Sequence, residues 1–193
     1  MKNKINEIIE ESIRVKRDVQ NNLINDINIA AELIIDCFNH KKKILVCGNG
    51  GSAADAQHFA GELVGRFTIE RDALPCISLT TNTSTITAWS NDYDYDTIFQ
   101  RQVQAFGEGG DILIGISTSG NSKNVIKSIE KARDIGIKSI ALLGCNGGEI
   151  KKISDFSIIV KSNNTPRIQE AHIMILHIVC EIIEKRLFET NHI

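Results

Sequence analysis

The chain has 193 residues, of which 42% are hydrophobic and 24% are charged. This length and composition are typical of one globular domain with a sizeable core, with or without a helical appendage. The 22 basic and 24 acidic residues give a formal charge of -2 without a long block of either sign, which argues against a nucleic-acid-binding arm or a polybasic membrane patch.

The first 39 residues carry a helical pattern and no strand-like run. Ile5, Ile8, Ile9 and Ile13 recur near helical spacing, and a second such run follows Asp26, a possible N-cap. The pattern predicts one long or two consecutive amphipathic helices, whose apolar face needs a partner to be stable. We therefore expect a helical oligomerisation segment at 1–39 that joins a unit at 40–193 in one structural domain.

From residue 43 onwards, short apolar runs alternate with helical stretches. The runs lie at 43–47, 74–79, 111–116, 138–143 and 156–160, and the helical stretches lie at 53–66, 84–106, 122–135 and 166–188. Short apolar runs are typical of strands covered on both faces, and their alternation with helices predicts an α/β fold with a doubly wound, five-stranded parallel sheet. Ligands of such sheets bind at the carboxyl ends of the strands.

Two polar loops lie at such ends. The first contains Asn49, Gly50, Gly51 and Ser52, where a strand passes into a helix, and its glycines allow a ligand to approach the free backbone N–H groups. A tight turn would have the same composition.

The second loop places four hydroxyls within six residues, on Ser117, Thr118, Ser119 and Ser122. Hydroxyls beside a helix N-terminus suit a phosphate monoester, although such residues also serve as N-caps and turn formers. The loop has no lysine and no GxxxxGK[ST] pattern, which argues against a nucleotide P-loop. Together the two loops predict one sugar-phosphate site and no nucleotide.

Histidine and carboxylate side chains follow at helical spacing. His58 and Glu62 are four residues apart, so they share a helix face and could meet one metal ion or one substrate atom. By itself, such a pair is more often a solvated surface pair. His172 and His177 are five residues apart, about 140° around a helix, so they do not share a face, which argues against a ligand pair. A lone histidine among apolar neighbours, as His177 is, is usually a core residue.

Three longer strings carry a family resemblance: CGNGGSAADAQHFAGELVGRF, GISTSGNSKNVIKSIEKARDIG and RIQEAHIMILHIV. Together they resemble the sugar isomerase (SIS) family over nearly the whole chain, and the HFAxEL and RIQExHxxxxH patterns resemble its branch that isomerises a seven-carbon sugar phosphate. The resemblance implies a flavodoxin-like SIS domain at 40–193. The implied reaction converts sedoheptulose 7-phosphate to D-glycero-D-manno-heptose 7-phosphate through an enediol, for bacterial surface glycans.

The resemblance also implies roles for individual residues. Glu62 and His177 would be the catalytic acid/base pair, and one Zn2+ per subunit would be held by His58, Glu62, Gln169 and His177. The substrate would contact Asn49, Gly50, Gly51, Ser52, Arg66, Asn91, Asp92, Ser117, Thr118, Ser119, Ser122 and Gln169. The family forms homotetramers with active sites at subunit interfaces.

The spacing of two implied ligands raises a difficulty. Gln169 and His177 are eight residues apart, roughly 12 Å along a straight helix and about 80° around it. A shared ion would need long side chains, an irregular first turn after Pro166 or a contribution from another subunit.

Two other functions fit the same fold. One is an SIS isomerase of a pentose or hexosamine phosphate, and the other is a non-catalytic SIS adaptor of the kind that associates with the bacterial replication initiator. Such adaptors lack the catalytic pair, so the presence of both Glu62 and His177 favours an enzyme.

The cysteines and the apolar segments indicate the cellular compartment in which the protein is expected. Five widely spaced cysteines without a CxxC pair argue against a disulfide framework and a thiolate zinc site. The first 14 residues lack the apolar segment of a signal peptide, and the apolar stretch 173–183 is too short to cross a bilayer. We expect a cytoplasmic protein with no membrane partner.

Overall fold

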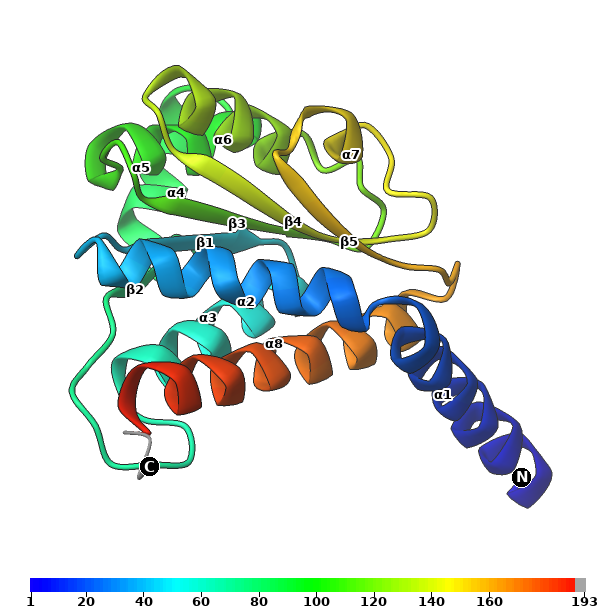
Figure 1. Ribbon diagram of the computed structural model, residues 1–193. Helices are drawn as coiled ribbons and strands as arrows, with labels where there is room; N and C mark the ends of the chain where they lie inside the picture. Colours follow the sequence, from blue (N-terminus) through cyan, green and yellow to red (C-terminus); the bar gives the residue numbers. More distant parts are fainter. Residues whose placement is uncertain (190–193) are drawn as a thin grey trace.

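A five-stranded parallel sheet forms the centre of the molecule (Figure 1), in a computed structural model that describes residues 1–189. The last four residues of the expected 40–193 unit lie outside the described part. The strands are β1 (Ile44–Gly48), β2 (Cys76–Ser78), β3 (Ile112–Ser117), β4 (Lys138–Gly144) and β5 (Phe156–Val160), in the order β2-β1-β3-β4-β5. This flavodoxin-like order confirms the expected doubly wound α/β fold, and it places the topological switch point between β1 and β3.

Helices cover both faces of the sheet. In Figure 1, α2 (Ile24–Asn39), α3 (Gly51–Val64) and α8 (Thr165–Phe188) lie below it, and α4 (Thr83–Asp92), α5 (Ile98–Phe106), α6 (Lys123–Asp134) and α7 (Ile150–Ile153) lie above it. Along β1, Ile44 and Val46 join the core of the lower layer, whereas Leu45 and Cys47 join the core of the upper layer. Alternation of side chains across a strand therefore explains why the strands read as unbroken apolar runs.

The stretch expected to be helical at 84–106 is helical over most of its length, but it is divided into α4, a 3-10 turn and α5. The chain leaves α4 at Tyr93, where φ is -132° and ψ is -94°. The Asp94 carboxylate then accepts a hydrogen bond from the Asp96 backbone N–H at 2.8 Å and begins a 3-10 turn, η1 (Tyr95–Thr97), before α5. A local side-chain cap here competes with helix continuation, as Asp and Asn commonly do.

The N-terminal segment forms two consecutive helices, not one long helix. α1 (Lys2–Asn22) and α2 are consecutive helices that meet at Leu23, where φ is -118° and ψ is 2°. α1 extends away from the two layers (Figure 1), and Ser12 near its middle donates a hydrogen bond to Glu170 of α8 at 2.6 Å. Ile5, Ile8 and Ile9, further towards the N-terminus, are exposed.

Within residues 1–189, no helix has the combination of length and hydropathy required to cross a lipid bilayer.

One histidine lies inside the lower core. His172 of α8 is 0% exposed, and its Nε2 lies 3.0 Å from the carbonyl oxygen of Leu143 at the end of β4. Since a carbonyl only accepts, Nε2 carries the proton, and Nδ1 has no partner among the described residues. Burial lowers the pKa of the imidazole to about 4, although the hydrogen bond to Leu143 offsets part of that shift. The histidine is therefore neutral at physiological pH.

This low pKa predicts a pH dependence of stability. Between pH 6.5 and about 4, the unfolded state binds a proton at His172 that the folded state does not bind, so the free energy of unfolding should fall as the pH falls, by up to about 1.4 kcal/mol per pH unit. Urea unfolding at several pH values measures this slope. His172→Gln, which keeps a donor for Leu143, should show a shallower slope, whereas His40→Gln, at an exposed position, should keep the wild-type slope. Equal slopes in all three proteins would contradict the assignment.

Candidate active site

Two helix N-termini flank the switch point between β1 and β3. α3 begins directly after β1 and α6 begins shortly after β3, with Gly50 and Ser122 as their N-cap residues. Neither cap makes a side-chain hydrogen bond to its helix, and neither helix has an acidic residue in its first turn. In α3 the N–H groups of Ser52 and Ala53 donate to the carbonyl oxygens of Asn49 and Gly50 at 3.0 Å each, whereas the first-turn N–H groups of α6 have no backbone partner among the described residues. These α6 N–H groups and the positive ends of the two helix dipoles form a candidate site for an anion.

The hydroxyl-rich loop explains why Ser122 does not cap α6. Its Oγ lies 2.9 Å from Oγ of Ser117, a buried residue at the end of β3, and Ser117 Oγ also accepts a hydrogen bond from the Gly120 N–H at 3.2 Å. Thr118 is half-buried, and Ser119 is exposed with its Oγ accepting from the Asn121 N–H at 3.1 Å. The four hydroxyls expected to bind phosphate therefore lie in one loop at the sheet edge.

The glycine-rich loop lies beside it. Gly50 has a φ of +56°, in the left-handed region that favours glycine, and Ser52 is buried in the first turn of α3. The side-chain Nδ2 of Asn49 donates to Oδ1 of Asn124 on α6 at 2.8 Å, and Asn49 Oδ1 accepts from Nδ2 of Asn124 at 2.9 Å and from the Tyr95 hydroxyl at 3.0 Å. A reciprocal amide pair thus joins the two loops.

Sequence reasoning identified Asn49 but missed its two partners, Asn124 and Tyr95. An asparagine in the first turn of a helix is ordinarily read as a local turn residue, and neither partner is near Asn49 in the sequence.

His58, Glu62 and His177 converge on one point. His58 Nε2 lies 2.9 Å from His177 Nε2 and 3.1 Å from Glu62 Oε1. One potential ligand atom from each of the three residues lies within 4.8 Å of the other two. His58 is exposed and the other two are half-buried, so the group, which we call the His–Glu–His triangle, is open to a ligand. Two imidazole nitrogens and a carboxylate oxygen suit zinc, whose catalytic sites commonly keep three protein ligands and one open position.

The carboxyl of Asp55 lies on the same helix, and sequence reasoning missed it. One of its oxygens is buried and has no hydrogen-bond partner within the described residues. Burial raises the pKa of this carboxyl to about 6, and the nearby His58 offsets part of the shift. Asp55 precedes His58 by three residues and Glu62 by seven, so helical spacing was the available signal.

The remaining predicted residues lie outside the triangle. Gln169 packs against Gly51, because a methyl group built on Gly51 would overlap its amide. Arg66 is exposed, with Nε 3.5 Å from a Glu70 carboxylate oxygen. The Asn91 amide donates to the Asp92 carboxylate at 2.9 Å, and both residues are exposed at the end of α4. The roles of these residues in substrate or metal binding stay predictions.

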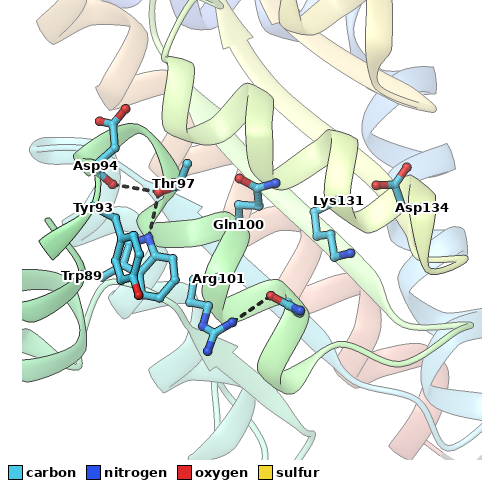
Figure 2. Close-up of a pocket in the computed structure, with 9 residues that line it drawn as sticks. Trp89, Tyr93, Asp94, Thr97, Gln100, Arg101, Lys131 and Asp134 are labelled. Carbon is cyan, nitrogen blue, oxygen red and sulfur yellow. Dashed lines mark hydrogen bonds between the residues drawn. The ribbon is translucent and has the colours of Figure 1, made fainter.

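A separate hollow of about 550 Å3 lies between α4, α5 and α6. Figure 2 shows Trp89 stacked on Tyr93 with Arg101 beside them, and Lys131 lies further along the hollow on α6. The lining contains neither of the two polar loops and no member of the His–Glu–His triangle. We place the candidate active site at the switch point, because the free helix termini and the candidate metal ligands are there.

Comparisons with known proteins identify the family and agree with the fold. A sequence model described as SIS domain matches residues 7–144. A phosphoheptose isomerase of Clostridium acetobutylicum is 54% identical over 190 residues, which are 97% of each chain. One of Sulfurimonas denitrificans is 50% identical over 190 residues, with the same coverage.

Solved structures match as well. The phosphoheptose isomerase GmhA of Neisseria gonorrhoeae superposes with a TM-score of 0.91 at 43% identity, covering 95% of this chain and 98% of its own. A phosphoheptose isomerase of Francisella tularensis superposes with a TM-score of 0.92 at 42% identity, covering 95% and 97%.

Proposed function

The chain belongs to the SIS domain family, and we propose that it is a phosphoheptose isomerase that converts sedoheptulose 7-phosphate to D-glycero-D-manno-heptose 7-phosphate. The observation that carries this proposal is the His–Glu–His triangle, formed by two residues of α3, the helix that begins at the anion site, and by His177 of α8. His58 follows Ser52 by six positions on α3, about 9 Å along the helix. An extended seven-carbon sugar phosphate can span that separation, with its phosphate at the loops and C1 and C2 at the triangle.

The reaction moves hydrogen within the substrate and has no net redox change. Glu62 removes a proton from C1 while His177 donates a proton to the C2 oxygen, and an enediol forms. Glu62 then returns the proton to C2 while His177 removes the proton from the C1 hydroxyl, and the aldehyde forms at C1. The Glu62 carboxylate and the His177 imidazole lie in one cluster, so both can reach adjacent carbons of one substrate, as general acid–base catalysis needs. Binding of the phosphate at the helix N-termini orients the reacting carbons.

We further propose one zinc ion per subunit. His58, Glu62 and His177 would hold it, and Gln169 would be a fourth ligand or a substrate contact. When bound, zinc supplies Lewis-acid stabilisation of the oxygen charge that develops between C1 and C2.

The first prediction tests the base. Glu62→Gln keeps the size of the side chain but removes the group that accepts the C1 proton, so kcat should fall at least about a hundredfold, the usual scale for a general base. Fold and phosphate binding should be preserved. A steady-state assay on sedoheptulose 7-phosphate measures the rate, and Glu130→Gln, at an exposed position of α6, is the matched control. Rates for Glu62→Gln within a few-fold of wild type would exclude this role.

The second prediction tests the metal. Elemental analysis of the purified protein should find a bound divalent ion, and exhaustive chelation should lower activity, with recovery when zinc is added. His58→Gln should bind the ion more weakly, because it removes one of the nitrogen ligands. Full activity of a protein in which no metal is detected would leave the triangle with acid–base roles only.

We also propose that the protein is a homotetramer with active sites at subunit interfaces. An apolar groove of about 480 Å3 lies between α1, α2 and α8. Its lining includes Ile13, Ile24, Met174 and Ile178, the last of which follows His177. Together with the exposed Ile5, Ile8 and Ile9, this apolar surface is a candidate contact between copies of the chain. Its position supports an interface that adjoins the triangle.

The third prediction tests assembly. Deleting residues 1–25 removes α1 and most of the groove wall, so the deletion should abolish both tetramer formation and activity. Light scattering gives the mass in solution. Deleting residues 1–4 alone, which leaves every isoleucine of α1 in place, should change neither property. A monomer mass near 21.4 kDa for fully active protein would overturn the proposal.

We propose that the enzyme works in the cytoplasm and supplies precursors of heptose-containing bacterial surface glycans. The cysteines support a reducing compartment, because all five are free thiols and four of them are buried.

A further inference from the structure

A buried ion pair joins the loop after α3 to α8. The side chains of Arg71 and Glu184 are each 1% exposed, and Arg71 Nε lies 2.9 Å from Glu184 Oε1. The Glu184 carboxylate also accepts hydrogen bonds from the backbone N–H groups of Phe67 at 2.7 Å, Thr68 at 2.8 Å and Ile69 at 3.2 Å, and from the Thr68 hydroxyl at 2.9 Å. One carboxylate thus holds three consecutive backbone groups of the loop.

The hydrogen-bonding groups of this ion pair have partners, which a buried charge requires if it is not to destabilise the fold. Burial alone would raise the pKa of the Glu184 carboxyl, but its hydrogen bonds from Thr68, Phe67 and Ile69 lower it to about 2. The carboxylate is therefore ionised at any pH at which the enzyme would work. Replacement of Glu184 would leave a buried guanidinium and several backbone donors without their acceptor.

Arg71, the other member of the pair, caps the C-terminus of α3. Arg71 Nη2 donates to the carbonyl oxygen of Glu62 at 2.8 Å, and Nη1 donates to the carbonyl oxygens of Leu63 at 2.8 Å and Asp72 at 2.9 Å. The last turn of an α-helix has free carbonyl groups, and a cation is favourable there. Arg71 therefore fixes the backbone of the residue that carries the predicted catalytic carboxylate.

The loop also touches the second catalytic candidate. Phe67 donates its N–H to Glu184, and its ring centroid lies 5.5 Å from that of His177, with an angle of 34° between the planes. The pair thus acts on both sides of the triangle, through the backbone of Glu62 on α3 and through the ring of Phe67 against His177 on α8.

We propose that Glu184 is a positioning residue that, together with Arg71, sets the separation of Glu62 and His177 and the orientation of the His177 ring. It touches neither substrate nor metal and acts through Phe67 and the end of α3. The kinetic part of this inference rests on the proposed isomerase activity, whereas the geometric part does not.

The competing explanation is that the pair only stabilises the fold. In that case Glu184→Gln would lower the melting temperature but leave the triangle intact in the molecules that remain folded. The two explanations differ in what happens at the histidine rings and at the metal, so the test uses variants at a temperature at which circular dichroism shows each of them folded.

The experiment compares wild type, Glu184→Gln and the matched control Glu181→Gln. Glu181 lies on α8 one turn earlier and is exposed, with Oε1 accepting from Lys185 at 2.6 Å. Three measurements are made: NMR spectra of metal-free protein labelled with 15N-histidine, the zinc affinity by competition with a chelator, and kcat and KM for sedoheptulose 7-phosphate. For Glu184→Gln we expect the ring resonances of His58 and His177 to shift and zinc to bind at least about tenfold more weakly. We also expect kcat to be at least about tenfold lower, with KM within about threefold of the wild-type value. Glu181→Gln should match wild type in all three.

Unchanged ring resonances together with zinc affinity within twofold of wild type, in folded Glu184→Gln, would overturn the positioning role. If Glu184→Gln does not fold, Phe67→Leu decides the question, because it keeps the ion pair and removes only the ring against His177. It should shift the His177 resonances and weaken zinc binding, whereas Phe106→Leu, at an exposed position of α5, should do neither, and unchanged spectra and affinity in Phe67→Leu would overturn the inference.

The same measurements separate this inference from the proposed function. A wild-type protein that does not turn over sedoheptulose 7-phosphate would refute the isomerase assignment. The histidine spectra would still report whether Glu184 positions the triangle.

Discussion

The parallel packing of α3 against α8 is the contact on which the functional geometry depends. Three points along the two helices correspond in order: Gly51 lies against Gln169, His58 meets His177, and the loop after α3 meets Glu184. Neither helix carries the triangle by itself. Apolar residues buried in one core hold the helices together, among them Phe59 and Leu63 of α3 and Ile175 and Val179 of α8. Since interiors pack densely, this contact fixes the register to within a fraction of a helical turn.

A second constraint acts at the edge of the sheet, where the fold leaves polar groups free for a ligand. The Ser122 hydroxyl faces Ser117 and does not cap α6, and α3 begins after a glycine that has no side chain to offer. The first-turn N–H groups of α6 and the positive ends of both helix dipoles are therefore available to a phosphate dianion. The parallel neighbours β1 and β3 direct these two termini to one point. An anion site at this position follows from topology, and its position relative to the triangle follows from the length of α3.

Much of this arrangement could be predicted from the sequence, because it depends on local patterns. The unbroken apolar runs predicted the strands, and their alternation with helices predicted the sheet and the edge at which ligands bind. The spacing of His58 and Glu62 placed two members of the triangle on one face. His177 could not be placed from its own surroundings, since a histidine among isoleucines reads as core, and only the family resemblance indicated it. The break between α4 and α5 was missed because Asp94 caps the next turn through its own side chain. Glu184 was missed because its five donors come from residues more than a hundred positions away.

The position of Gln169 excludes one of the three ways in which Gln169 and His177 could bind the same metal ion. α8 is helical from Thr165 onwards without interruption, so an irregular first turn does not bring the two residues together. In a single chain, the Gln169 amide lies at the N-terminus of α3, beside the loops that would hold the phosphate. From there the amide is well placed to contact a substrate that extends from the loops to the triangle. Metal ligation within one chain would instead require the side chain to swing away from Gly51 and cover two turns of α8. In the proposed homotetramer, a neighbouring subunit could supply the same amide without that movement, and the apolar groove that includes Ile178 is the candidate contact with such a subunit.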